Sequence, residues 1–92
     1  MSIAVRFSPK SLTAAKYDEI VGKLAGTGEW PAQGLEYHVC FGSEGDLHVA
    51  EVWASQEQFA AFGERLMPIL AASGIEMSAP PEIADVHNVI KG

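Results

Sequence analysis

The sequence is poor in cysteine and in basic side chains, and each shortage excludes a class of protein. Cys40 is the one cysteine among 92 residues, so no internal disulfide can form, as is usual in a reducing compartment. Six lysine and arginine residues stand against twelve acidic residues, which gives a net charge of −6. Such a chain cannot assemble the positive stripe that binds a phosphate backbone. We therefore expect no nucleic-acid partner.

Long apolar runs, export signals and nucleotide motifs are missing as well. No apolar run approaches the roughly 20 residues that cross a bilayer, and no basic segment followed by an apolar stretch opens the chain. The sequence has no glycine-rich phosphate loop, dinucleotide fingerprint or nucleophile triad. We expect a cytoplasmic protein that has no membrane contact and no cofactor. With no repeat and no linker, residues 1–92 are expected to form one domain.

The first third of the chain contains the patterns of one strand, one helix and one loop. Apolar and other side chains alternate over residues 2–8, which predicts a half-buried strand. Thr13 is placed to cap a helix whose apolar residues recur at helical spacing as far as Gly26. The segment 26–34 has no periodicity and several glycine and proline residues. It is predicted to be a loop that carries one large aromatic side chain, Trp30.

Two alternating segments, 35–41 and 47–53, predict a β-hairpin. A three-residue loop ending at Gly45 would place Phe41 opposite Leu47 and Tyr37 opposite Glu51. In that register all the large apolar side chains of both strands share one face of the sheet.

The last third predicts a second helix and a fourth strand. Ser55 and Gln58 form a capping box ahead of an apolar helical face. Pro68 should kink this helix or divide off its last turn, and Gly74 should end it. After the extended segment 79–81, alternation predicts a strand over residues 83–90.

The order β-α-β-β-α-β predicts the α+β, ferredoxin-like fold, a four-stranded antiparallel sheet with both helices on one face. The other face is mixed, too apolar for plain solvent surface and too polar for a core. It is expected to pair with a second sheet in a homodimer. The residues predicted at this interface are Arg6, Glu36, His38 and His48.

The run from Glu51 to Phe59, a strand ending in Val-Trp followed by a serine-capped helix opening with Phe, resembles the dimeric α/β-barrel superfamily, especially its antibiotic biosynthesis monooxygenase group. The resemblance implies subunits paired sheet to sheet and, among several activities, cofactor-independent oxygenation of aromatic or quinol-type substrates. It assigns Trp53 to the ligand cavity. The haem-degrading members do not fit, because segment 59–67 lacks their histidine and segment 3–8 lacks their asparagine.

Glu51 is the most informative residue, because strand parity places its carboxylate on the apolar, helix-facing side. A buried carboxylate must be hydrogen-bonded, paired or protonated. We expect Glu51 and Tyr37 to form a catalytic pair at the floor of a small cavity. The alternative is a structural carboxylate bonded to Tyr37 or Arg65. The residues predicted to wall the cavity are Trp30, Trp53, Phe59 and Phe62.

The histidines offer weaker candidates. His87 is a possible acid or base by residue type, although a histidine bonded to backbone at a strand end is the simpler interpretation. His38 and His48 with Glu36 could form a metal site, but no short ligand motif supports it, and we predict interface hydrogen bonds and no metal. The leading functional hypothesis is a monooxygenase-like enzyme. The alternatives are a non-catalytic ligand-binding or interaction module and, third, an acid–base isomerase that uses His87.

Overall fold

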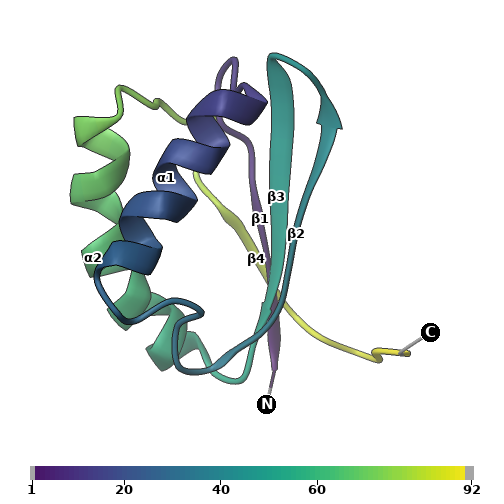
Figure 1. The fold of residues 1–92 in the computed structure, drawn as a ribbon. Coiled ribbons are helices and arrows are strands. Elements are labelled where there is room, and N and C mark those ends of the chain that lie inside the picture. Colours follow the sequence, from purple (N-terminus) through teal and green to yellow (C-terminus); the bar gives the residue numbers. More distant parts are fainter. Residues whose placement is uncertain (1, 91–92) are drawn as a thin grey trace.

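A computed structural model describes residues 2–90. It contains six elements in the order β1 (Ile3–Phe7), α1 (Ala14–Gly26), β2 (Leu35–Ser43), β3 (Asp46–Trp53), α2 (Gln56–Ala72) and β4 (Glu82–Asp85). The strands form one antiparallel sheet in the order β2-β3-β1-β4. Both helices cover the same face of this sheet, and the other face is bare (Figure 1). The ferredoxin-like prediction is confirmed.

Local sequence signals determine where the helices begin. The Thr13 hydroxyl accepts a hydrogen bond from the Lys16 amide at 3.1 Å, and the Ser55 hydroxyl accepts one from the Gln58 amide at 3.2 Å. Each bond satisfies an amide that the first helical turn leaves free. Helix α2 continues through Pro68 to Ala72 as one element, and Gly74 follows with a positive φ of 72°. Pro68 therefore does not divide off the last turn.

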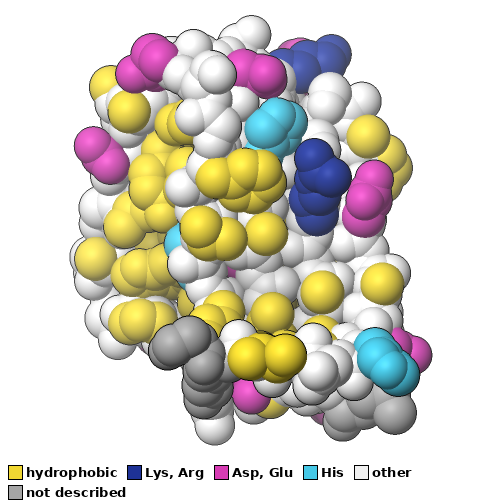
Figure 2. Space-filling model, turned by 90° about the vertical axis from the view of Figure 1, so that its right-hand side faces the viewer, with side chains coloured by type: hydrophobic (Ala, Val, Ile, Leu, Met, Phe, Trp, Pro, Cys, Tyr) yellow, Lys and Arg dark blue, Asp and Glu magenta, His cyan; other side chains and the backbone are white. Residues whose placement is uncertain are grey.

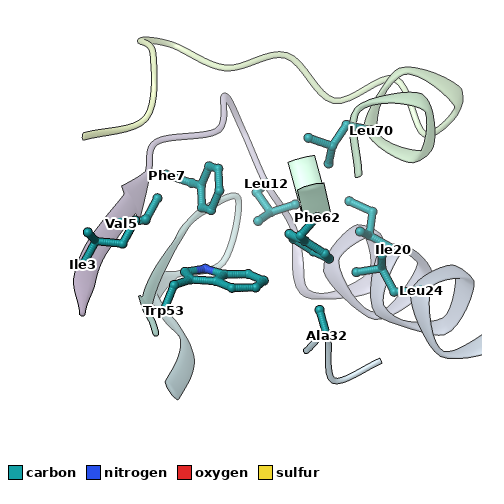
Figure 3. Packing of buried hydrophobic residues seen from close by; sticks show 10 residues of the cluster. All are labelled: Ile3, Val5, Phe7, Leu12, Ile20, Leu24, Ala32, Trp53, Phe62 and Leu70. Carbon is teal, nitrogen blue, oxygen red and sulfur yellow. The ribbon is translucent and has the colours of Figure 1, made fainter. Parts of the chain in front are cut away.

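The core lies between the helices and the inner face of the sheet. Ile3, Val5 and Phe7 of β1 point into it, and the indole of Trp53 lies among them and Phe62 of α2 (Figure 3). Trp53 is completely inaccessible to solvent. Burial of one such aromatic side chain contributes roughly 3 kcal/mol or more to folding.

The hairpin differs from its prediction by one residue. Ser43 pairs with Asp46 across a two-residue turn, so Phe41 lies opposite His48 and His38 lies opposite Glu51. A bulge between Leu35 and Tyr37 shifts the register near the start of β2. The predicted pairs Phe41–Leu47 and Tyr37–Glu51 are wrong, because the loop is shorter than expected.

This one-residue slip exchanges the two faces of β2. A strand presents successive side chains to opposite faces, so His38 and Cys40 now share the helix-covered face with Glu51. Tyr37, Val39 and Phe41 face away from the helices and are 39%, 51% and 40% exposed. Leu35, before the bulge, still packs against the core.

The fourth strand is also shorter than predicted. Strand β4 ends at Asp85, and residues 86–90 form no regular structure. The chain beyond β4 runs away from the sheet (Figure 1). His87 therefore lies outside the strand, in an exposed segment.

The bare face, which we call the open face, carries an apolar band. Its surface is formed by the outward side chains of the four strands and is shallowly hollowed around Ala4, Arg6, Tyr37, Ala50 and Ala84. Figure 2 shows hydrophobic side chains gathered there, with a basic and an acidic side chain beside them. No helix within the described residues is long and apolar enough to cross a membrane.

Candidate functional site

A cavity of about 60 Å³ lies between the inner face of the sheet and the two helices. Its walls are almost entirely apolar, and its polar side chains are Tyr17, His38 and Glu51. The apolar wall consists of Phe7, Pro9, Leu12, Ile20, Val21, Leu24, Trp30, Val49, Phe62, Leu66, Leu70, Ile75 and Met77. A concave apolar space with a few convergent polar groups is the usual form of a small-molecule site.

The three polar side chains form one continuous chain of hydrogen bonds. Glu51 Oε2 lies 2.6 Å from His38 Nδ1, and His38 Nε2 lies 2.7 Å from the Tyr17 hydroxyl. These residues come from β3, β2 and α1, three elements that pack against one another. We call this set, Tyr17–His38–Glu51, the relay.

Glu51 is held at its other oxygen by Trp53. The indole N–H donates to Glu51 Oε1 at 2.9 Å, two residues along the same strand. Glu51 is only 4% exposed, so its two hydrogen bonds replace most of its lost hydration. The carboxylate therefore has a fixed orientation, with Oε2 toward His38.

The partners determine the tautomer of His38. An ionised Glu51 carboxylate can only accept, so Nδ1 of a neutral imidazole must carry the hydrogen. Nε2 is then an acceptor, and the Tyr17 hydroxyl donates to it. Burial raises the pKa of the Tyr17 phenol, and neighbouring acidic groups, Cys40 and Glu51 foremost, add to the rise. A phenol that keeps its proton is the donor this arrangement requires.

Aromatic rings fix the position of the imidazole. The Tyr17 ring stacks on it at 5.9 Å between centroids, and the edge of Trp30 meets it at 5.3 Å with the planes 89° apart. The His38 side chain is 19% exposed. The imidazole is thus oriented by a carboxylate on one nitrogen and reaches a phenol on the other, which is the arrangement of a general base with an orienting acid.

The structure divides the predicted site residues into two groups. Glu51, Trp30 and Phe62 line the cavity. Trp53 does not line it and lies beneath it as the hydrogen-bond donor to Glu51, while Phe59 packs against Phe7 and Trp53. The two predicted partners of Glu51, Tyr37 and Arg65, are replaced by His38 and Trp53.

Tyr37 and His38 exchange the positions predicted for them. Tyr37 lies on the open face, opposite Val52 of β3, and His38 lies in the cavity. His87 is exposed beyond β4 and lines none of the cavity. The acid–base role proposed for His87 has no support from its position.

The remaining interface candidates stay on or near the open face. His48 packs on the Phe41 ring at 5.8 Å, and Arg6 lies opposite Ala50 and Glu82. Glu36 accepts a hydrogen bond from the Ser2 hydroxyl at 2.7 Å. Within residues 2–90 no group of three His, Cys, Asp or Glu side chains could hold a metal. His38 and His48 lie on opposite faces, which removes the combination considered from the sequence.

Sequence analysis missed Tyr17 altogether. Tyr17 lies at one of the helically spaced apolar positions of segment 14–26, and a tyrosine at such a position is ordinarily core. Cys40 also lies on the cavity face, where burial raises the pKa of its thiol and Asp18 raises it further. A thiol of this kind stays protonated and is not a nucleophile.

Comparison with solved structures supports the architecture. A provisionally assigned antibiotic biosynthesis monooxygenase from Chloroflexus aurantiacus J-10-fl superposes with a TM-score of 0.68 at 14% identity, covering 99% of this chain and 98% of that one. SnoaB, a cofactor-independent oxygenase from Streptomyces nogalater, superposes with a TM-score of 0.62 at 12% identity, covering 99% and 96%. The chain has the ferredoxin-like fold of antibiotic biosynthesis monooxygenase-like proteins.

The same fold also occurs in a designed protein. The de novo designed protein Foldit4 superposes with a TM-score of 0.64 at 11% identity, covering 95% of this chain and all of the other. No protein-family model matches the sequence, and a comparison with characterised proteins finds no match. At these identities the likeness is one of fold, and function has to be argued from the site.

Proposed function

We propose that this protein binds a small phenol- or quinol-type molecule in the cavity and oxygenates it without a cofactor. The observation that carries the proposal is the relay, because it presents an oriented acid–base pair to an otherwise apolar cavity. An apolar wall suits an aromatic ring, and the hydroxyl of Tyr17 offers a hydrogen-bond partner to the ring's own hydroxyl.

In the proposed reaction the relay removes one proton from the substrate. The substrate hydroxyl gives its proton to the Tyr17 oxygen while Tyr17 passes its own to His38 Nε2, and the imidazolium formed is stabilised by Glu51. The substrate anion then reduces dioxygen. For a quinol, the products are a hydroxyquinone and water, so all four electrons come from the substrate and no external reductant is needed. A positioned general base of this kind contributes about 10²- to 10⁴-fold to rate.

The fold neighbours support this choice of chemistry. SnoaB is a cofactor-independent oxygenase, and its fold is the one described above. A cofactor-free reaction also fits a chain whose sequence carries no nucleotide motif.

Oxygen uptake with a panel of single-ring phenols and quinols tests the proposal. We expect uptake by the wild-type protein, and a loss of about 100-fold in kcat/KM in Glu51→Gln, which keeps the shape of the side chain but cannot stabilise the imidazolium. Tyr17→Phe, which removes the hydroxyl that receives the substrate proton, should also lower kcat/KM. Tyr37→Phe is its matched control, because Tyr17 of α1 lines the cavity whereas Tyr37 of β2 lies on the open face. Binding without uptake across the panel would overturn the enzymatic proposal and leave a ligand-binding module.

We also propose that the open face pairs with the open face of a second copy. Three large side chains, Tyr37, Val39 and Phe41, are exposed there side by side. His48 Nδ1 is buried on this face without a hydrogen-bond partner within residues 2–90, and such an atom usually finds one in the native assembly. Solution mass by size exclusion with light scattering, over a dilution series, tests the dimer. A monomer at every concentration would overturn it.

A further inference from the structure

The cavity is too small for the ligand class proposed for it. Its volume is about 60 Å³, whereas an engineered cavity that accepts benzene measures about 150 Å³. A phenol or quinol therefore enters only if part of the wall moves. Most of the wall belongs to the packed core, where a displacement would open voids.

The part of the wall that can move at least cost is the loop of residues 27–34, which we call the Trp30 loop. Between residues 29 and 33 its backbone makes one hydrogen bond to backbone, from the Leu35 amide to the Ala32 carbonyl at 3.1 Å. The segment has no regular structure, and Gly28 and Gly34 flank it with φ values of 78° and 92°. Ala32 is buried and anchors the end nearer β2. The Gly28 amide is still bound to the Ala25 carbonyl at 3.1 Å, and the Glu29 amide donates to the Thr27 hydroxyl at 3.2 Å. Residues 29–31 form no backbone-to-backbone hydrogen bond among the described residues, so they are the part of the loop that can be displaced at least cost.

Trp30 is the side chain that this segment places over the relay. Its ring meets His38 edge-on at 5.3 Å and lies 5.9 Å from the Phe62 ring. It thus closes the cavity between the imidazole and α2. It is half-buried, so its removal exposes the cavity without emptying the centre of the core.

An ion pair holds the loop closed. The residue before Trp30, Glu29, forms an ion pair with Arg65 of α2, whose Nε lies 2.9 Å from Glu29 Oε2. The Arg65 guanidinium lies 5.9 Å from the centre of the Phe62 ring. No other ion pair within the described residues joins this loop to a helix. Both side chains are largely exposed, and an exposed pair is weak enough to open reversibly.

We infer that Trp30 is the specificity-determining residue of the cavity: it sets the largest ring system admitted, and its loop opens by breaking the Glu29–Arg65 pair. The inference rests on the proposed function only in taking the cavity as the ligand site. The ligand class is a single-ring phenol or quinol, because one ring needs only the displacement of Trp30. Fused rings would also require the core side chains to move.

Binding of phenol and of 1-naphthol, measured by calorimetry, tests the size limit. We expect the wild-type protein to prefer phenol, and Trp30→Ala to shift the ratio of the two dissociation constants toward 1-naphthol by about tenfold or more, since pocket size of this order discriminates by 10- to 200-fold. Trp30→Phe, which keeps a ring, should shift it less. An unchanged ratio in a folded Trp30→Ala protein, or no binding of either probe to it, would overturn the inference.

Acrylamide quenching of tryptophan fluorescence tests the ion pair without any ligand. Trp53 is fully buried, so quenching reports mainly on Trp30. Glu29→Gln should raise the quenching constant by up to about fivefold, as expected for loss of a weak surface pair. Glu19→Gln is the control, because Glu19 pairs with Lys16 and Lys23 on α1. Equal quenching in both variants would overturn the role of the ion pair.

Failure of the role proposed for Trp30 can be distinguished from failure of the proposed oxygenation. If Trp30→Ala gains 1-naphthol binding but no quinol supports oxygen uptake, the size limit stands and the enzymatic proposal fails. If fused-ring substrates are oxygenated as fast as single-ring ones by the wild-type protein, the enzyme stands and the role of Trp30 fails.

Discussion

The two faces of the sheet use the same residue types for different purposes. On the covered face, His38 is held between Glu51 and Tyr17 at hydrogen-bond distance. On the open face, His48 packs on Phe41, and its Nδ1 is buried without a partner within residues 2–90. A histidine acquires acid–base potential from what orients its ring, and residue type alone does not provide this. Pairs of matched substitutions on the two faces can therefore test the account.

The largest expected effect is on stability, at Trp53. Trp53→Ala should lower the free energy of unfolding by about 3–5 kcal/mol, because it empties the centre of the core. Trp53→Phe should cost about 1–3 kcal/mol, since it leaves Glu51 Oε1 without its donor. Met67, 64% exposed on α2, is the control, and Met67→Ala should stay within about 0.5 kcal/mol. Urea unfolding at fixed protein concentration measures all three. Equal losses at Trp53 and Met67 would contradict the described core.

The next largest expected effect is on catalytic activity, and it should distinguish His38 from His48. His38→Gln should reduce kcat/KM for quinol oxygenation by about 100-fold or more, because it removes the proton acceptor of the relay. His48→Gln should change it by less than about threefold, provided the mass in solution is unchanged. Steady-state oxygen uptake measures both. A greater loss in His48→Gln would move the chemistry to the open face and refute the site.

A substitution at Val39, which is exposed on the open face, tests whether this face forms the proposed dimer interface. Val39→Lys should weaken the proposed dimer by about ten- to hundredfold, because an unpaired ammonium would be desolvated in the interface. Light scattering over a dilution series gives the change. His38→Gln should leave the mass as it is. A dimer unaffected by Val39→Lys would show that the copies pair through another surface.

The smallest expected effect is on the pH dependence of the free energy of unfolding at alkaline pH, and it arises from Tyr17. Its pKa is raised above the usual 10.0 in the folded protein, so the folded state holds a proton that the unfolded chain releases. The resulting stability is complete below pH 10 and is lost as the pH rises through the folded-state pKa. Urea unfolding should show a steeper loss above pH 10 in the wild type than in Tyr17→Phe. Cys40, whose pKa is also raised, contributes in both proteins, so the difference in slope between them reports on Tyr17. Equal slopes in the two proteins would contradict the raised pKa of Tyr17.

Much of the fold could be predicted because the signals are local. The alternation in β1 and the hydroxyl caps Thr13 and Ser55 each depend on a few neighbouring residues. The inward direction of Glu51 and Trp53 followed from the parity of a single strand. Each of these features is independent of how the hairpin closes.

The relay could not be predicted, because it depends on a register. Apolar side chains alternate so regularly over 35–41 that they indicate a core face. The two-residue turn between Ser43 and Asp46 instead directs Tyr37, Val39 and Phe41 outward, and only Leu35, before the bulge, still packs against the core. A slip of one residue exchanges the faces completely. The sequence pattern therefore predicts His38 at the interface and Tyr37 in the cavity, the reverse of their positions in the structure. Contact between Tyr17 and His38 joins α1 to an edge strand, and no local pattern indicates it.

Nitrogen-15 NMR of the histidine side chains tests the central claim, that Glu51 orients His38 toward Tyr17. We predict that His38 is fixed as the Nδ1–H tautomer in the wild-type protein, and that Glu51→Gln releases this preference while the spectrum of His48 stays the same. Rapid exchange between tautomers at His38 in the wild type, or a His38 spectrum that does not respond to Glu51→Gln, would contradict the account.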